Sequence, residues 1–284
     1  MKLLTLCDDA QLFAACTLRD PSDPLEGSTA LHTTHDQTAV MQNRQALSHH
    51  LGIPLTDWCL SAQTHSAHAY HVRHADRGRG ACSMHDAIAD CDALYTEERR
   101  LLIGVFTADC VPLLCHDPHS GIIAAIHSGW PGTVKQITHH TLRTLLAQGL
   151  QPASTRVWIG PCIHTASFQI RQDVIDQIRA LPFDTAPYLH VQADGSALCD
   201  NVGLNVHMLQ KQGIPRDNIH ICALDTCAER TRCSSYRRDH TTQRHLTFLY
   251  RKYRASPTMP SIICPLFSNR SVSIDLIFVR GQLP

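Results

Sequence analysis

Two short apolar runs, each followed at once by reactive side chains, constrain the fold of this chain more than any other feature. Leu101–Phe106 leads into Thr107-Ala108-Asp109-Cys110, and Gly121–Ile126 leads into His127-Ser128-Gly129-Trp130. Runs of this length are typical of buried strands, and α/β proteins place ligands at the carboxyl ends of their strands. We therefore expect both runs to lie in a sheet, with a site where they end.

Further strands and helices alternate around these runs. The sequence predicts helices at residues 37–51, 173–181 and 202–212, and an amphipathic helix from Gly132 toward a stop signal at Gly149. It predicts strands at residues 58–62, 93–96, 111–115, 156–159, 219–223 and 246–250. In the first helix Val40, Ala46, Leu47 and Leu51 can share one face. The alternation indicates an α/β or α+β fold.

Composition and charge exclude several classes of protein. The 284 residues carry 25 Lys+Arg and 25 Asp+Glu, so an electrostatic nucleic-acid or membrane binder is not expected. With 43% hydrophobic residues the chain can form a core, which excludes a disordered chain or a fibre. No apolar stretch approaches the roughly 20 residues of a membrane span. Acidic residues also follow the first few residues too closely for a secretory signal peptide. We expect a soluble, cytoplasmic protein.

Cysteine and histidine are unusually abundant, with 13 Cys and 20 His. The cysteines are odd in number and unevenly spaced, and no CxxC pair occurs, so the sequence favours reduced thiols over a disulfide framework. Most of these cysteines are expected to be small hydrophobic core residues.

Three reactive residues follow predicted strands and form a candidate metal site: His65, Cys110 and His127, which are 45 and 17 residues apart. Two imidazoles and one thiolate suit zinc, and three protein ligands leave the fourth position for water or substrate. The spacing alone does not distinguish this site from a core cysteine beside two histidines with structural hydrogen bonds. A nucleophilic Cys–His pair that uses Cys110 is a further alternative.

Other side chains are candidates for substrate handling. Asp109 can orient a ligand or carry a proton, or simply cap a turn. Gly129 can bring the backbone close to an anion at a helix start, or only permit a tight connection. Arg237, Arg238 and Arg244 suit phosphate or carboxylate, or belong to a solvated charged loop.

The motifs around these candidates resemble one family. In chain order they are Gln63-Thr64-His65, Thr107-Ala108-Asp109-Cys110-Val111-Pro112, His127-Ser128-Gly129-Trp130-Pro131-Gly132-Thr133, Ile159-Gly160-Pro161 and Ser235-Tyr236-Arg237-Arg238-Asp239. Together they resemble the YfiH-type family, known as purine nucleoside phosphorylases and earlier as multicopper polyphenol oxidases or laccase-domain proteins. Asn43-Arg44 and Asp92-Ala93-Leu94 fit weaker signatures of the family, and the resemblance spans roughly residues 37–250.

The resemblance implies a single layered α/β (α+β) domain, in which helices flank mixed central sheets. We assign this domain to residues 1–253 and a C-terminal extension to residues 254–284. It also implies a zinc ion held by His65, Cys110 and His127, with catalysis at these residues and Asp109. Arg237, Arg238, Arg244 and Gly129 are then expected to contact substrate or phosphate.

The implied activity is phosphorolysis of adenosine, inosine, guanosine and S-methyl-5′-thioadenosine, with adenosine deamination in the same site, by a monomer or homodimer. Ser128 and Pro131 stand where the family usually has Ala and Arg. Three alternatives stay open: a copper-dependent polyphenol oxidase, a peptidoglycan-editing factor, and a non-catalytic metal-binding relative. The same thiolate and imidazole ligands accept copper as well as zinc.

Overall fold

The two apolar runs of the sequence lie in two different sheets. The computed structural model describes residues 1–253, so the predicted extension at residues 254–284 lies outside the described residues. The run that ends near Asp109 forms a central strand of a five-stranded sheet. The strands of this sheet, in spatial order, are β1 (Lys2–Asp8), β2 (Leu12–Leu18), β14 (His245–Arg251), β6 (Leu102–Thr107) and β3 (Trp58–Cys59).

The second run forms a strand of a six-stranded sheet, where it pairs antiparallel with the strand that comes directly before it in the sequence. This sheet consists of β13 (Ile219–Ile221), β9 (Arg156–Ile159), β7 (Val111–His116), β8 (Ile123–Ser128), β5 (Ala93–Thr96) and β4 (Ala69–His71). A small third sheet contains β10 (Gln169–Ile170), β12 (Ala197–Cys199) and β11 (Leu189–Val191). Both large sheets mix parallel and antiparallel pairs.

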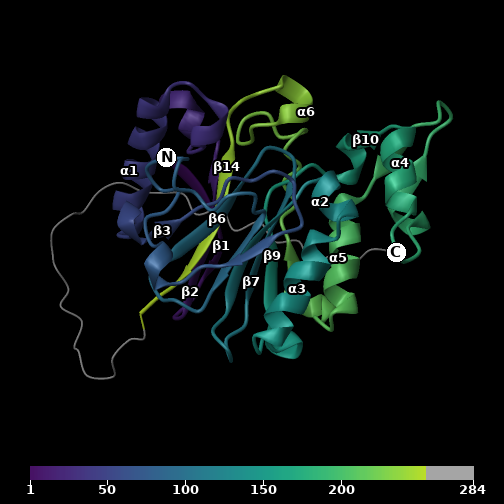
Figure 1. Ribbon diagram of the computed structural model, residues 1–284. Coiled ribbons are helices and arrows are strands. Elements are labelled where there is room, and N and C mark those ends of the chain that lie inside the picture. Colours follow the sequence, from purple (N-terminus) through teal and green to yellow (C-terminus); the bar gives the residue numbers. More distant parts are fainter. Residues whose placement is uncertain (254–284) are drawn as a thin grey trace.

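Helices cover the outer faces of the two large sheets (Figure 1). The α-helices are α1 (Gln37–Leu51), α2 (Trp130–Val134), α3 (Ile137–Ala147), α4 (Gln172–Arg179), α5 (Asn201–Lys211) and α6 (Tyr236–Asp239). Short 3-10 helices are η1 (Pro24–Gly27), η2 (Leu31–Thr33), η3 (Leu55–Asp57), η4 (His74–Asp76), η5 (Pro152–Ser154), η6 (Thr165–Ser167), η7 (Ala186–Tyr188) and η8 (Arg216–Asn218). Within residues 1–253 no helix is long and apolar enough to cross a membrane.

The alternation of side chains along the strands builds the layers. On β6, Ile103 and Val105 pack into the core between the two large sheets, whereas Leu102 and Phe106 pack on the opposite face with Leu47 of α1. Successive strand residues point to opposite faces, so one strand supplies both cores. On β8, Ala124 and Ile126 point toward helices α3 and α5, because they belong to one buried cluster with Leu142 of α3 and Leu209 of α5. The predicted layered domain with mixed sheets and flanking helices is confirmed.

Most predicted elements are present, with corrections at their ends. The helix over residues 37–51 is confirmed, but Ala46 is exposed and Asn43 and Arg44 are buried instead. The predicted helix from Gly132 is wrong as one element: helix α2 begins at Trp130, and Gln136 adopts a left-handed conformation (φ 60°) that separates it from α3.

Three strands have boundaries that differ from the sequence prediction by two residues or more. Strand β8 extends through Ser128, so His127 lies inside the strand rather than after it. Strand β3 is limited to Trp58–Cys59, and β13 ends at Ile221. The sequence does not predict β1 and β2, because consecutive apolar residues in both segments obscure the alternation that marks a strand.

Candidate metal centre and its cavity

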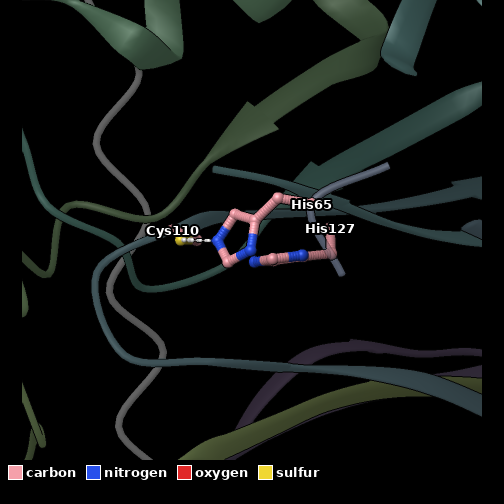
Figure 2. A group of neighbouring side chains, drawn as sticks. All are labelled: His65, Cys110 and His127. Atoms are coloured by element: carbon pink, nitrogen blue, oxygen red, sulfur yellow. Dashed lines mark hydrogen bonds between the residues drawn. The ribbon is translucent and has the colours of Figure 1, made fainter. Parts of the chain in front are cut away.

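His65, Cys110 and His127 converge, although they come from three separate segments (Figure 2). His65 lies in the loop after β3, Cys110 in the turn that passes from β6 in one sheet to β7 in the other, and His127 near the end of β8. Their ligand atoms all lie within 4.8 Å of one another, and Cys110 Sγ is 3.7 Å from His65 Nε2. The fold therefore brings together the three residues that the sequence predicts as a metal site.

The distance between Cys110 and His65 fits a tetrahedral metal. Zinc bonds of about 2.3 Å to sulfur and about 2.05 Å to nitrogen, at a tetrahedral angle, place sulfur and nitrogen about 3.6 Å apart. The distance of 3.7 Å between Cys110 Sγ and His65 Nε2 agrees with this value. The group can hold a metal ion with a fourth position left for another ligand.

A buried carboxylate, Asp92, orients both histidines of the group. Its Oδ1 lies 2.7 Å from His127 Nδ1, and the backbone N–H of His65 donates to the same oxygen at 3.1 Å. The Oδ2 atom accepts hydrogen bonds from the backbone N–H groups of Thr64 and Ser66 and from the Ser66 hydroxyl. Such a partner fixes the tautomer of a metal-binding histidine, here leaving Nε2 of His127 toward the centre.

In the sequence Asp92 stands out only through a weak family signature, which gives it no role. The one local signal is its position directly before β5. Its partner His127 is 35 residues away, so no sequence spacing marks the contact.

Electrostatics favour the metal-binding form of Cys110. Burial by itself raises the pKa of a thiol, but the neighbouring His127 and His65 outweigh it and lower the pKa of Cys110 to about 6. Burial likewise opposes a charged His127, yet Cys110 and Asp92 raise the pKa of His127 to about 9. The thiolate, which is the form that binds metal, therefore predominates at neutral pH.

Gly129 has no room for a side chain because it packs against the ligands. A Cβ atom at this position would lie 2.7 Å from His65 Cδ2 and 2.8 Å from Cys110 Sγ. The glycine precedes α2, a helix of only five residues. The backbone of Gly129 thus lies close to the candidate metal ligands, and an approach to substrate or phosphate stays a prediction.

A cavity of about 570 Å³ opens beside the three ligands, all of which line it. Aromatic and apolar side chains form much of its wall: Phe106, Trp130, Pro131, Ile163, Phe168 and Tyr236. Polar residues of the wall include His32, Gln63, Asp109, Asn201, Arg237 and Arg244. A mostly apolar cavity with a few converging polar groups is typical of a small-molecule site. Of the wall residues, only Asp109, Arg237 and Arg244 were predicted from the sequence as site residues besides the ligands.

The three predicted arginines have different positions. Arg237 and Arg244 line the cavity, with their guanidinium groups over the rings of Phe168 and Tyr236 at 5.3 and 5.9 Å. Arg238 is not part of the wall: its guanidinium donates to the carbonyl oxygens of Thr226 and Cys233.

Asp109 lines the cavity and also connects the loop that carries Thr226 to helix α6. Its Oδ1 accepts a hydrogen bond from the Thr226 hydroxyl, and its Oδ2 accepts one from the backbone N–H of Arg237, each at 2.6 Å. Asp109 has a left-handed backbone (φ 94°) between β6 and β7. With both carboxylate oxygens occupied, this residue anchors the segment that carries Arg237.

Comparison with known proteins agrees with this site and fold. Residues 23–252 match the family described as multi-copper polyphenol oxidoreductase laccase, and the chain belongs to this family. The family resemblance inferred from the motifs is confirmed.

Two sequence relatives and one solved structure illustrate the similarity. The chain is 32% identical over 225 residues to purine nucleoside phosphorylase YlmD of Bacillus subtilis, covering 78% of this chain and 81% of the relative. It is 30% identical over 219 residues to adenosine deaminase RL5 of an unknown prokaryotic organism, covering 76% of this chain and 84% of the relative. The crystal structure of the Bacillus licheniformis hypothetical protein YfiH superposes with a TM-score of 0.81 at 29% identity, covering 84% of this chain and 92% of that chain.

Proposed function

We propose that this protein is a zinc-dependent purine nucleoside phosphorylase with adenosine deaminase activity in the same site. Adenosine, inosine, guanosine and S-methyl-5′-thioadenosine are its proposed substrates. The observation that carries the proposal is the position of His65, Cys110 and His127 in the wall of one cavity that also has aromatic and arginine side chains. The names of the relatives YlmD and RL5 support the two activities.

The donor set supports zinc as the metal. Two imidazoles, one thiolate and an open fourth position match catalytic zinc sites, and a bound zinc ion would supply Lewis acidity beside the cavity. Cys110, His65 and His127 hold the metal in this proposal, and Asp92 keeps His127 in the required orientation.

In phosphorolysis a phosphate oxygen forms a bond to C1′ of the ribose while the bond from C1′ to N9 of the purine breaks. The products are the free base and ribose 1-phosphate, and a proton goes to the departing base. Arg237 and Arg244, which line the cavity, are proposed to position phosphate, whereas Arg238 lies outside the wall. Asp109 contributes by anchoring the backbone of Arg237.

In deamination water adds to C6 of adenosine and ammonia leaves, which gives inosine. This reaction needs no phosphate. The ratio of the two activities therefore reports on phosphate binding separately from nucleoside binding.

The copper-dependent oxidase alternative receives less support. Within residues 1–253, His65, Cys110 and His127 are the only group of three or more His, Cys, Asp or Glu residues that could hold a metal. A polyphenol oxidase of the laccase type uses several copper centres, and one three-residue group does not supply them.

The test is an adenosine assay on metal-analysed protein, with and without phosphate, in which adenine, inosine and hypoxanthine are separated by chromatography. We expect one zinc per chain, phosphate-dependent adenine or hypoxanthine, and loss of zinc and turnover in Cys110→Ala. Cys82→Ala is the matched control, because Cys82 is an exposed free thiol outside the cavity wall.

Other results would change the assignment. Inosine as the sole product would leave a deaminase. Zinc without turnover would favour another substrate, such as a peptidoglycan precursor, or a binding role. A Cys110→Ala variant that keeps both zinc and full activity would rule out the proposed centre.

A further inference from the structure

His32 extends into the cavity without a hydrogen-bond partner from the protein. It lies on η2 (Leu31–Thr33), lines the cavity and has an exposed side chain. Its imidazole lies against the ring of Phe106, with centroids 5.4 Å apart and the planes at 59°. Neither ring nitrogen is hydrogen-bonded to another residue of the described part of the chain. A ligand in the cavity can therefore use these nitrogens.

The ring beneath His32 is held firmly. The side-chain amide of Gln63 donates to the carbonyl oxygen of Phe106 and accepts from its backbone N–H, at 2.9 and 2.7 Å. The guanidinium carbon of Arg44 lies 5.5 Å from the centroid of the Phe106 ring. Phe106 thus gives the imidazole of His32 a fixed surface to pack on.

Arg44 adds a buried positive charge behind Phe106, outside the cavity wall itself. Its guanidinium donates to the carbonyl oxygens of Thr29, Gly80 and Ala81, and its Nη2 is buried without a partner. Burial lowers the pKa of Arg44 to about 10, so the side chain stays charged at neutral pH. It forms no ion pair with a carboxylate among residues 1–253. A buried charge that is not neutralised favours a nearby anion.

Arg244 lies close to the same corner. Its backbone N–H donates to the Ser28 hydroxyl at 3.1 Å, which ties the start of β14 to the segment that leads into η2. Its Nη1 donates to the carbonyl oxygens of Thr241 and Gln243. The Nε and Nη2 atoms have no partner in the described part of the chain, so two N–H directions remain for a ligand.

The neighbouring arginine charges also influence the protonation state of His32. Partial desolvation against the cavity wall, together with the charges of Arg244 and Arg44, lowers the pKa of His32. A neutral imidazole retains one N–H donor at neutral pH. Two guanidinium groups and a neutral imidazole provide donors and positive charge, which match an oxyanion better than an uncharged purine or ribose.

We propose that His32 and Arg244 together bind the phosphate co-substrate, with Arg44 as a buried positioning charge behind Phe106. The inference rests on the proposed phosphorylase function, and it identifies the corner of the cavity that receives the anion. The imidazole N–H of His32 and the free N–H groups of Arg244 donate to phosphate oxygens. The apolar wall that includes Trp130 and Pro131 is left for the purine.

The kinetic test uses His32→Phe in the zinc-loaded protein, because Phe keeps a ring on Phe106 and removes the N–H donor. We expect the phosphate KM to rise about 10- to 100-fold, as for a lost hydrogen bond to a charged ligand, with the nucleoside KM nearly unchanged. The ratio of phosphorolysis to deamination should fall accordingly. Arg244→Met should raise the phosphate KM at least as much, and Arg244→Lys less.

His35→Phe is the matched control, because His35 is exposed on the same segment and does not line the cavity. We expect its kinetic constants to equal those of the wild type. An unchanged phosphate KM in His32→Phe would overturn the inference. An equal loss of deamination and phosphorolysis would also overturn it, because His32 would then serve the nucleoside.

Direct binding separates this inference from the proposed function. Inorganic phosphate is titrated into the zinc-loaded protein by calorimetry. Binding to the wild type that is lost in His32→Phe would support the subsite even if no phosphorolysis occurs. Equal binding to both proteins would place phosphate elsewhere, for example on the metal, and no binding to the wild type would exclude the subsite.

Discussion

Nδ1 of His127 and Oδ1 of Asp92 lie 2.7 Å apart between two almost completely buried side chains. Although burial opposes an ionised carboxyl, hydrogen bonds from His127 and Ser66 hold the pKa of Asp92 below its ordinary range. The same carboxylate accepts the backbone N–H of His65. One charged group thus aligns two of the three candidate metal ligands.

We predict that Asp92→Asn weakens zinc binding about 10- to 100-fold, as is usual when the partner of a metal-binding histidine is removed. The amide keeps the size of the side chain but not its charge. Competition with a chromophoric chelator measures the affinity. Asp90→Asn is the control, since Asp90 is exposed and bonds to the Thr64 hydroxyl instead, and it should bind zinc normally. Equal affinities in both variants would contradict the role of Asp92.

Gly129→Ala should displace the ligands. Its Cβ would lie 2.8 Å from Cys110 Sγ, closer than atoms pack, so either the sulfur or the backbone must move. We expect a zinc content well below one per chain and a loss of stability of about 1–3 kcal/mol. Gly132→Ala is the control, because its Cβ would lie no closer than 3.2 Å to any atom, the nearest being Cγ2 of Ile137, and would touch no side chain of the candidate ligands. Full zinc occupancy in Gly129→Ala would refute this explanation of the glycine.

Arg238 should stabilise the fold rather than bind phosphate. Its guanidinium donates to several backbone carbonyl oxygens between residues 226 and 233. We expect Arg238→Lys to lower the free energy of unfolding by about 1–3 kcal/mol, because Lys cannot reach all these acceptors. The phosphate KM should change less than about twofold, well below the effect of a lost hydrogen bond to a charged group. A tenfold rise in the phosphate KM at an unchanged free energy of unfolding would show instead that Arg238 binds phosphate.

Mild acid should destabilise the protein through His116. This side chain is fully buried on β7, and burial together with the nearby Arg156 lowers the pKa of His116 to about 4. The pKa of His116 in the unfolded chain is about 6.5. As the pH falls below this value, the unfolded chain binds a proton at His116 whereas the folded protein does not, so the free energy of unfolding decreases.

The loss attributable to His116 is about 2 kcal/mol between pH 7 and pH 5. Urea unfolding of the wild type and His116→Asn at both values measures it. The variant should be less sensitive to pH over this interval, although it is less stable at pH 7. Identical pH dependence in the two proteins would mean that His116 is not buried in its neutral form.

Local sequence patterns predicted much of the fold. The helix over residues 37–51 and the strand over residues 93–96 have the predicted bounds, because caps and apolar periodicity act within a few residues. The break at Gln136 was not predicted, since a left-handed residue without glycine leaves no sequence signal. The burial of Asn43 and Arg44 on α1 was not predicted either, because the carbonyl oxygens that accept their hydrogen bonds lie in loops elsewhere in the chain.

The sequence by itself determined the candidate ligands. His65, Cys110 and His127 were identified from residue types and their positions after strands. The sequence could not separate Arg237 from Arg238. Neighbouring residues on a helix point about 100° apart, so on α6 only one of the pair faces the cavity.

Only the tertiary structure determined the surroundings of these ligands. Asp92 meets His127 across 35 residues, and Arg244 meets Ser28 across 216. Contacts at such separations depend on how the two sheets and their loops pack together. Strand and helix periodicity reflect backbone geometry within one element, whereas these contacts form only when the elements assemble.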